Sequence, residues 1–345
     1  MMMLRPLSLG ALSVVMGLSL TTATVGQAQE FMPPQDYPRS WDREFPIADF
    51  SRSTIDFNEV LSGGPPRDGI PAIDEPAFVS LAEAQDQQLY TAQEPVIGLE
   101  INGEAKAYPL QILTWHEIAN DVVGGVPVAV TYCPLCNAAI VFDTRVDGVA
   151  HTFGVSGRLR KSDMIMYDRE TESWWQQFNG DGLTGVHAGK ELTKVPSRIE
   201  SFERFAERFP EGQVLVPNGK HRRQYGRNPY RFYDAEGGRP FLYFGDLPEG
   251  IPPMARVVVA EGFEDKAYSM ALIAEQGVLR DGNLELSWFA GQNSALDASD
   301  ITQGRDVGNI VAQIINDDGS KEDIVYDVTF AFVYHAFEEG GTIVQ

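Results

Sequence analysis

Both cysteines of the 345-residue chain lie in one short segment, TYCPLCNAAIVFD, in which two residues separate Cys133 from Cys136. This spacing lets both sulfur atoms face one point, so the pair can supply two thiolates to a metal ion. It also suits a redox-active dithiol. An inert disulfide is the third alternative and would fit an oxidising compartment, although so short a loop constrains the unfolded chain little. Metal binding is the preferred interpretation of the three.

Further ligands for such a metal are scarce, because the chain has five histidines and no second CxxC motif. His116 precedes the cysteine segment and His151 follows it, so either could return to the cysteines in a compact packing, although a structural role is favoured for His151. Met166 offers a soft thioether sulfur from the strand-like run DMIMYD, where it shares a face with Met164 and Asp168. Two thiolates with a histidine or methionine suit copper, or zinc with an open position.

Glu117 is the candidate catalytic residue, because an open zinc position would allow Lewis-acid hydrolysis with this carboxylate as general base. Thiol–disulfide oxidoreduction at Cys133 and Cys136 is the alternative, and it predicts a low thiol pKa at Cys133. A third hypothesis is a non-catalytic recognition protein that retains an inert disulfide. Its aromatic groove would have as candidate walls Trp115, Tyr132, Trp174 and Trp175.

The segment HRRQYGRNPYRFYD is the one basic stretch of an otherwise acidic chain. Within it, Arg227 is a candidate ligand-binding residue, since a guanidinium group suits planar anions. Local neutralisation of the surrounding acidic residues explains the same basic stretch equally well. The anion-binding role therefore stays one of two alternatives.

Regular elements around the cysteines follow from turn residues and apolar patterning. Asn102-Gly103 between the strand-like runs 96–101 and 105–110 predicts a hairpin. The segment LQILTWHEIAND (110–121) has a helix-like apolar face and is predicted to end before Gly124-Gly125. VPVAVTYC and AAIVFD then predict strands on either side of the CxxC motif. A thioredoxin-type dithiol would instead lie at the N-terminus of a helix, so that fold is disfavoured.

The first 28 residues have the parts of a secretory signal peptide, namely Arg5, an apolar run at 7–20 and small residues before Gln29. The apolar run is shorter than the ~20 residues that a membrane-spanning helix needs. We therefore expect cleavage near Gln29 and export of the mature chain to the periplasm or the outside. No later apolar stretch approaches spanning length, so no membrane insertion is expected after cleavage.

The chain carries 49 Asp and Glu residues against 27 Lys and Arg residues, a net charge of -22. Such a surface repels phosphate backbones and anionic lipids, so nucleic acid and membrane surfaces are not expected partners. The sequence also contains no nucleotide cofactor motif. An unidentified small molecule or a metal ion remains as the expected partner.

The chain outside the signal peptide divides into an arm and two halves. Residues 29–90 are an extended arm with a Gly/Pro-rich loop, residues 91–215 a first half with the CxxC motif, and residues 216–345 a second half. The halves are suggested by a weak sequence similarity between GLEINGEAKAYPLQIL (98–113) and VAEGFEDKAYSMALI (259–273). Duplication and convergent hairpin composition would both produce this similarity. In a duplication, the second copy has no cysteines.

Several long motifs occur in an order that resembles a known family. They are SGGPPRDGIPAIDEPAFVS, INGEAKAYPLQILTWHEIANDVVGGVPVAVTYCPLCNAAIVFD, FGVSGRLRKSDMIMYDRETESWWQQ and YGRNPY. Together they resemble the exported bacterial and archaeal family called domain of unknown function 3179. The resemblance implies a shared fold and a shared centre around the cysteines and Trp115-His116-Glu117, and no activity. For the fold we predict an α+β protein, mainly antiparallel β with short helices, in which two related halves packed together are one option.

Overall fold

The predicted hairpin before the cysteine segment is confirmed. In the computed structural model, which describes residues 31–235 and 237–345, strand β3 (Pro95–Ile101) runs antiparallel to β4 (Glu104–Pro109). Asn102 and Gly103 make the turn with φ angles of 51° and 85°, the left-handed conformation that Asn-Gly turns adopt readily. The predicted signal peptide, residues 1–28, lies outside the described residues.

The long helix predicted after this hairpin is wrong. Only α3 (Leu110–Leu113) is helical, and β5 (Ile118–Val123) follows after a turn. The β-branched residues of β5 favour a strand, and Gly124 and Gly125, both at positive φ, close a hairpin rather than a helix. The chain therefore turns sharply between Leu113 and Ile118, and this turn carries His116 and Glu117.

The two strands predicted around the CxxC motif are confirmed. β6 (Val126–Cys133) pairs antiparallel with both β5 and β7 (Ala138–Asp143), and β13 (Thr193–Val195) extends this sheet beyond β7. Every residue of β6 from Val128 onward is buried. The cysteines thus lie in the turn that ends a central, buried strand.

Four further sheets surround this one. In spatial order, the first contains β1 (Val60–Ser62), β10 (Phe153–Arg160), β11 (Asp163–Asp168) and β12 (Trp174–Gln176), and the second contains β14 (Arg198–Ser201), β3, β4, β15 (Gln213–Val216) and β2 (Ala77–Ser80). The third contains β22 (Tyr326–Phe330), β16 (Arg256–Ala260), β17 (Lys266–Ser269) and β23 (Thr342–Val344), and the fourth contains β18 (Val278–Asp281), β19 (Leu284–Phe289), β20 (Asn309–Ile315) and β21 (Lys321–Asp323). A small ribbon is formed by β8 (Arg145–Val146) and β9 (Val149–Ala150).

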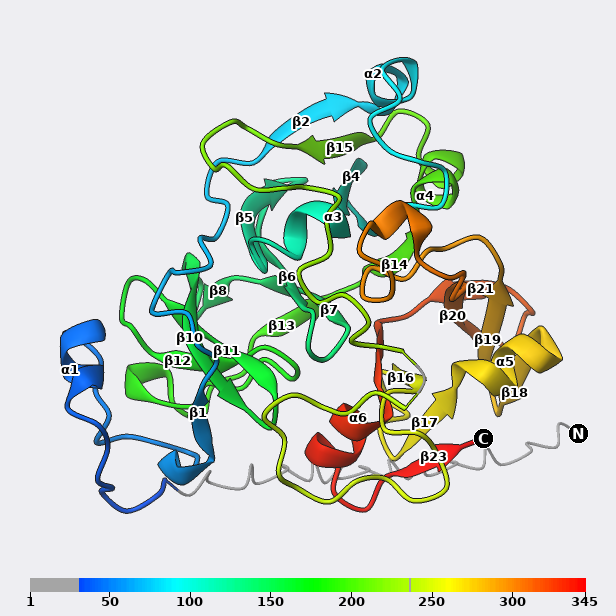
Figure 1. Cartoon of the computed structure of the whole chain (residues 1–345). Coiled ribbons are helices and arrows are strands. Elements are labelled where there is room, and N and C mark those ends of the chain that lie inside the picture. The colour runs from blue at the N-terminus through cyan, green and yellow to red at the C-terminus, as the bar shows by residue number, and fades with distance from the viewer. Residues whose placement is uncertain (1–30, 236) are drawn as a thin grey trace, which may run out of the picture. The chain divides into compact units, whose positions relative to one another are not determined.

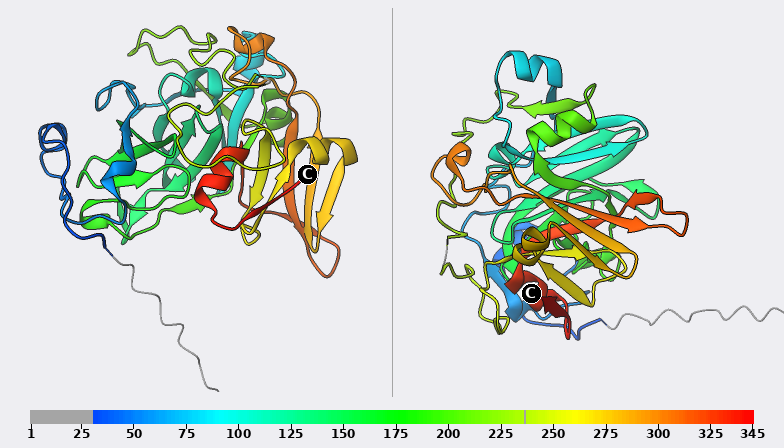
Figure 2. Two further views of the ribbon diagram at one scale, coloured as in Figure 1. Left: turned by 60° about the horizontal axis from the view of Figure 1, so that its bottom comes forward. Right: turned by 90° about the vertical axis from the view of Figure 1, so that its right-hand side faces the viewer.

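The five large sheets form a propeller-like ring within the described residues (Figure 1). Pairing is antiparallel except between β4 and β15 and between β17 and β23. The helices are short: α1 (Ser40–Glu44), α2 (Leu81–Asp86), α4 (Phe202–Arg208), α5 (Met270–Gln276), α6 (Ala331–Phe337) and the 3-10 turns η1 (Phe57–Glu59), η2 (Gly185–His187) and η3 (Ile301–Gln303). They lie against the sheets, as with α5 on β19 (Figure 2). The predicted mainly antiparallel β protein with short helices is confirmed.

The largest core cluster contains the cysteines. It joins residues of β6, β7, β10 and β11 with Trp175 of β12 and with Phe330 and Phe332 from β22 and α6. A separate cluster on the other face of β11 packs Ile165 and Tyr167 against Trp41, from the N-terminal segment. Among the described helices, none is long and apolar enough to cross a membrane.

Candidate functional site

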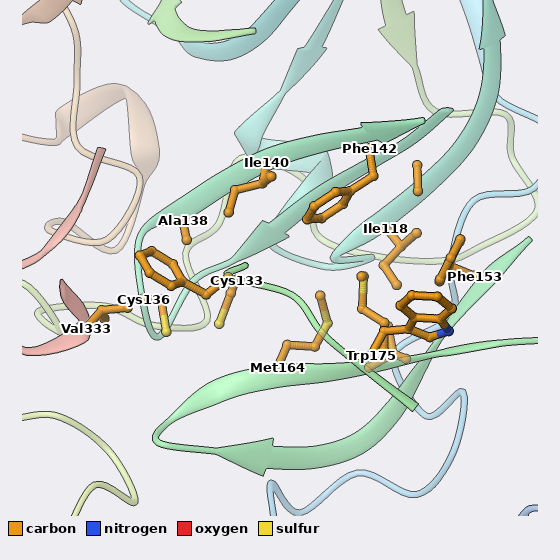
Figure 3. Close-up of a cluster of buried hydrophobic side chains, with 14 of the residues drawn as sticks. Ile118, Cys133, Cys136, Ala138, Ile140, Phe142, Phe153, Met164, Trp175 and Val333 are labelled. Carbon is orange, nitrogen blue, oxygen red and sulfur yellow. The ribbon is translucent and has the colours of Figure 1, made fainter. Parts of the chain in front are cut away.

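The turn between β6 and β7 holds both cysteines inside the protein. The amide of Cys136 donates to the carbonyl of Cys133 at 3.2 Å, which closes the turn. Neither side chain reaches solvent, and the two residues are free thiols. Figure 3 shows their sulfur atoms pointing from this turn toward the β10–β11 hairpin, from which Met164 comes. No disulfide joins the pair.

Asp163, at the start of β11, completes a three-residue group with the cysteines. One carboxylate oxygen and the two sulfur atoms all lie within 4.8 Å of one another. The tight turn at Lys161 and Ser162, both at positive φ, brings Asp163 to this position. Two successive residues at positive φ form the type I′ turn that joins the strands of a tight hairpin.

The Asp163 carboxylate is held on one side only. Its Oδ2 accepts hydrogen bonds from Gln176 Nε2 at 2.7 Å and from the amide of Phe178 at 2.9 Å. Its other oxygen, Oδ1, is buried and has no partner of hydrogen-bond geometry among the described residues, and the two thiols that the carboxylate faces favour its ionised form. Oδ1 is therefore placed to bind a ligand together with the two sulfur atoms.

Burial sets the protonation of all three groups. It raises the pKa of the Cys133 thiol and raises that of Cys136 well above its usual value. It also raises the pKa of Asp163 to about 6. At neutral pH the apo site therefore holds two thiols beside a carboxylate. The low thiol pKa at Cys133 that a thioredoxin-like dithiol needs is not what this environment produces.

Glu117 lies beside a cavity of about 300 Å³ next to this group. Leu135, between the cysteines, and Met164, next to Asp163, also line the cavity, together with Tyr230. Burial raises the pKa of Glu117 to about 7, and the Tyr230 hydroxyl donates to Glu117 Oε1 at 3.2 Å. A carboxyl group poised near neutral pH at a cavity is suited to proton transfer.

Glu117 also adopts an unusual backbone conformation. Its φ angle is 60°, and its amide and carbonyl are fixed by Leu113 and Tyr132 at 2.7 Å each. The turn before β5 therefore fixes the Glu117 side chain at the cavity, between His116 and Ile118, which are themselves fully buried. Strained residues persist where the surrounding structure over-determines them, and they cluster at functional sites.

His116 is engaged elsewhere. Its Nδ1 donates to the carbonyl of Pro71 at 2.7 Å, and its Nε2 pairs with the Tyr225 hydroxyl at 2.8 Å. Burial lowers the pKa of His116 to about 4, so the ring is neutral and Nε2 accepts from Tyr225. Within the described residues, His116 does not belong to the group around Cys133 and Cys136.

Met166 lies in the same core cluster as the cysteines, paired across β11 with Val155 on one side and Trp175 on the other. It does not line the cavity, whereas Met164 does. The predicted alternation along DMIMYD holds for four residues, since Met164 and Met166 share one core cluster and Ile165 and Tyr167 belong to another. The same alternation would put Asp163 on the face of Ile165 and Tyr167, and this is wrong, because Asp163 lies beside the cysteines.

The predicted aromatic and basic residues are placed apart from the cavity lining. Trp115 and Arg227 are brought together, since the indole donates to the Arg227 carbonyl at 3.1 Å. The Arg227 side chain is 62% exposed and lies 4.0 Å from Asp300. Tyr132, by contrast, is fully buried, as are Trp174 and Trp175, so none of these three faces solvent.

Two residues of the site were not found from the sequence. Asp163 is separated from the cysteines by four strands, β7 to β10, and Tyr230 belongs to an irregular segment before β16. The available signal for Asp163 was an acidic residue directly before the apolar run of residues 164–166, where a buried carboxylate needs a specific partner.

The fold and the site define a mainly antiparallel, propeller-like β protein with a buried thiol–carboxylate group. The family model described as "Protein of unknown function (DUF3179)" matches residues 67–341, and the chain belongs to this family. The resemblance seen in the motifs is thereby confirmed. Neither the curated proteins nor the solved structures contain a match.

Proposed function

We propose that this protein binds a metal ion through Cys133, Cys136 and Asp163. The observation that carries the proposal is the convergence of three ligand atoms within 4.8 Å in a fully buried position. Asp163 Oδ1 supports it, because this buried oxygen accepts no hydrogen bond of good geometry among the described residues, and a metal would bind it together with the two sulfur atoms that face the carboxylate. A metal would also displace the protons of the two thiols, and its positive charge would balance the two thiolates that result.

Zinc is the metal that this donor set suits best. Copper(I) prefers soft sulfur ligands, and a carboxylate is a hard oxygen ligand. Zn²⁺ accepts both thiolate and carboxylate ligands, and sites with three protein ligands keep a fourth position open. Copper bound through Met166 or through His116 would require that side chain to leave the contacts described above.

Glu117 is the proposed general base beside the open metal position. A bound zinc ion would supply Lewis-acid activation. The part of this chain is to accept a proton at Glu117 Oε1 or Oε2, to orient that carboxylate through the Tyr230 hydroxyl, and to exclude bulk water with Leu135 and Met164. The proposed activity is therefore metal-assisted hydrolysis of a small, largely apolar substrate in the 300 Å³ cavity.

A dithiol oxidoreductase is the alternative use of the same cysteines. Their proximity supports it, and the raised thiol pKa values and complete burial count against it. The third hypothesis, a recognition protein with an inert disulfide, lacks support because both cysteines are free thiols.

We also propose that the protein is exported and that it arose by duplication. Export rests on the signal-peptide features of residues 1–28, and N-terminal sequencing of the mature protein tests it. Duplication rests on two sheets with the same strand order, β14-β3-β4-β15 and β22-β16-β17-β23. In both, a lysine and a tyrosine of the sheet, on β4 or β17, meet one aspartate of the next strand of the chain, β5 or β18, at the same spacing. The residues are Lys106, Tyr108 and Asp121 in the first case, and Lys266, Tyr268 and Asp281 in the second.

Metal analysis of the native protein tests the proposed metal site. Protein purified without chelators should contain zinc at the thiol site, so the zinc content should fall by about one equivalent per chain in Cys133→Ser and in Cys136→Ser. Ala138→Ser is the matched control, since it adds a hydroxyl group at the buried start of β7, directly after the turn, without removing a sulfur. A zinc content that both cysteine variants leave unchanged, or a rapidly reducible disulfide in the native protein, would overturn the proposal.

A further inference from the structure

A second group of potential metal ligands lies at the opposite end of β11. It consists of His151, which follows β9, Asp168, which ends β11, and His187, which ends η2. One ligand atom from each lies within 4.8 Å of the others. The two imidazole rings meet edge to face with their centroids 4.9 Å apart. The three residues are distant in sequence, and the fold brings them to one point.

Both histidines have a buried ring nitrogen without a partner. Within the described residues, His151 Nδ1 and His187 Nε2 make no hydrogen bond. The His151 side chain is only 5% exposed, so water does not compensate this loss fully. Two unsatisfied buried nitrogens beside one carboxylate are costly in a purely structural role, and they are the arrangement that a metal would satisfy.

Asp168 is fixed as metal-ligating carboxylates usually are. Trp175 Nε1 donates to its Oδ2 at 3.0 Å, and the amide and hydroxyl of Thr171 each donate to Oδ1 at 2.7 Å. Among the described residues no lysine or arginine pairs with this fully buried carboxylate, and its one ion-pair contact is with His151. A cation is therefore the missing counter-charge.

We propose that His151, Asp168 and His187 bind a second metal ion, of the borderline divalent class represented by Zn²⁺. His151 Nδ1 lies 3.5 Å from Asp168 Oδ1, close to the ~3.4 Å that separates two ligands of a tetrahedral zinc ion at ~2.1 Å. Two imidazoles and one carboxylate suit zinc and disfavour copper(I). His187 is only partly buried, which gives the ion a path from solvent.

A second carboxylate stands nearby without closing the site. Glu170 Oε2 lies 3.5 Å from His151 Nδ1, and both Glu170 oxygens accept hydrogen bonds from Thr152. Glu170 is therefore committed to Thr152, and the fourth position stays available to water or a substrate. This second site does not depend on the thiol site proposed above, since the two share no ligand.

Zinc titration of a cysteine-free variant tests the second site. The full-length double variant Cys133→Ser/Cys136→Ser should still bind about one Zn²⁺ per chain and gain thermal stability when Zn²⁺ is added. Adding His187→Ala should weaken that binding at least about tenfold, since the loss even of a residue that only supports a ligand costs 10–100-fold. His335→Ala, which removes an exposed histidine, is the matched control and should change nothing.

Cobalt spectra separate the outcomes for the two sites. With Co²⁺ bound, the sulfur-to-cobalt charge-transfer band should disappear in the cysteine variant and persist in His187→Ala, if both sites exist. A cysteine-free variant that binds no Zn²⁺, or one whose binding survives His187→Ala and Asp168→Asn, would overturn the second site. Loss of the band in His187→Ala while its melting temperature is unchanged would show instead that the histidine belongs to the thiol site.

Discussion

Zinc binding at Cys133 and Cys136 should release about two protons at neutral pH. Burial holds both thiols protonated, so each must lose its proton before its sulfur binds the metal. Asp163, with a pKa of about 6, is already ionised above that pH and adds no proton there. The predicted affinity therefore rises about 100-fold per pH unit around pH 7 to 8, equivalent to about 2.7 kcal/mol, since each proton contributes ~1.36 kcal/mol per pH unit.

Calorimetry in buffers of different ionisation enthalpy measures this proton count directly. The His187→Ala background isolates the thiol site from the second proposed site. At zinc concentrations high enough to fill its weakened site, Cys133→Ser should release about one proton instead of two, so its affinity should depend less steeply on pH. Below about pH 6 the intact thiol site should release a further proton from Asp163, which steepens its pH dependence. Release of no protons in the background variant would refute the reasoning, because it would mean that the sulfurs are not ligands or are already ionised.

Three further predictions follow from buried carboxyl groups. Asp163→Asn should keep the shape of the site yet weaken zinc binding by at least about tenfold, as measured by competition with a chelating dye, and unchanged affinity would exclude Asp163 as a ligand. Tyr230→Phe should raise the pKa of Glu117 above about 7, because it removes a hydrogen bond that stabilises the carboxylate, and infrared titration of the carboxyl band would detect this or its absence. Burial raises the pKa of Glu94 to about 8, against the opposing effect of hydrogen bonds from Gln111. The unfolded chain loses this proton near pH 4.5 and the folded chain keeps it, so the free energy of unfolding should fall by up to ~1.4 kcal/mol per pH unit between about pH 5 and 8. Urea unfolding of Glu94→Gln should show no such decline. Identical pH profiles of stability in the variant and the native protein would contradict this account.

Local signals predicted the elements next to the cysteines well. Asn102-Gly103 fixed one hairpin, and apolar runs on either side of Pro134-Leu135 gave strands β6 and β7, because turn geometry and burial act over a few residues. The segment 110–121 failed because its apolar positions fit both a helix and a strand. Pairing of Ile118 with Thr131 on β6, a long-range contact, decided between them.

The site itself depended on contacts that no local pattern contains. Asp163 reaches the cysteines only because the β10–β11 hairpin folds back beneath the β6–β7 turn. His151, for which a structural role was favoured over a place near the cysteines, lies beside Asp168 and His187. Spacing in the sequence identified the thiol pair, whereas the residue that lies beside the pair, Asp163, follows only from the tertiary structure.

X-ray absorption at the zinc edge of the His187→Ala variant, loaded with one equivalent of Zn²⁺, tests the central claim most directly. The proposed site predicts two sulfur ligands at about 2.3 Å and at least one oxygen ligand at about 2.0 to 2.2 Å. A first shell containing only nitrogen and oxygen would contradict a metal site at Cys133, Cys136 and Asp163.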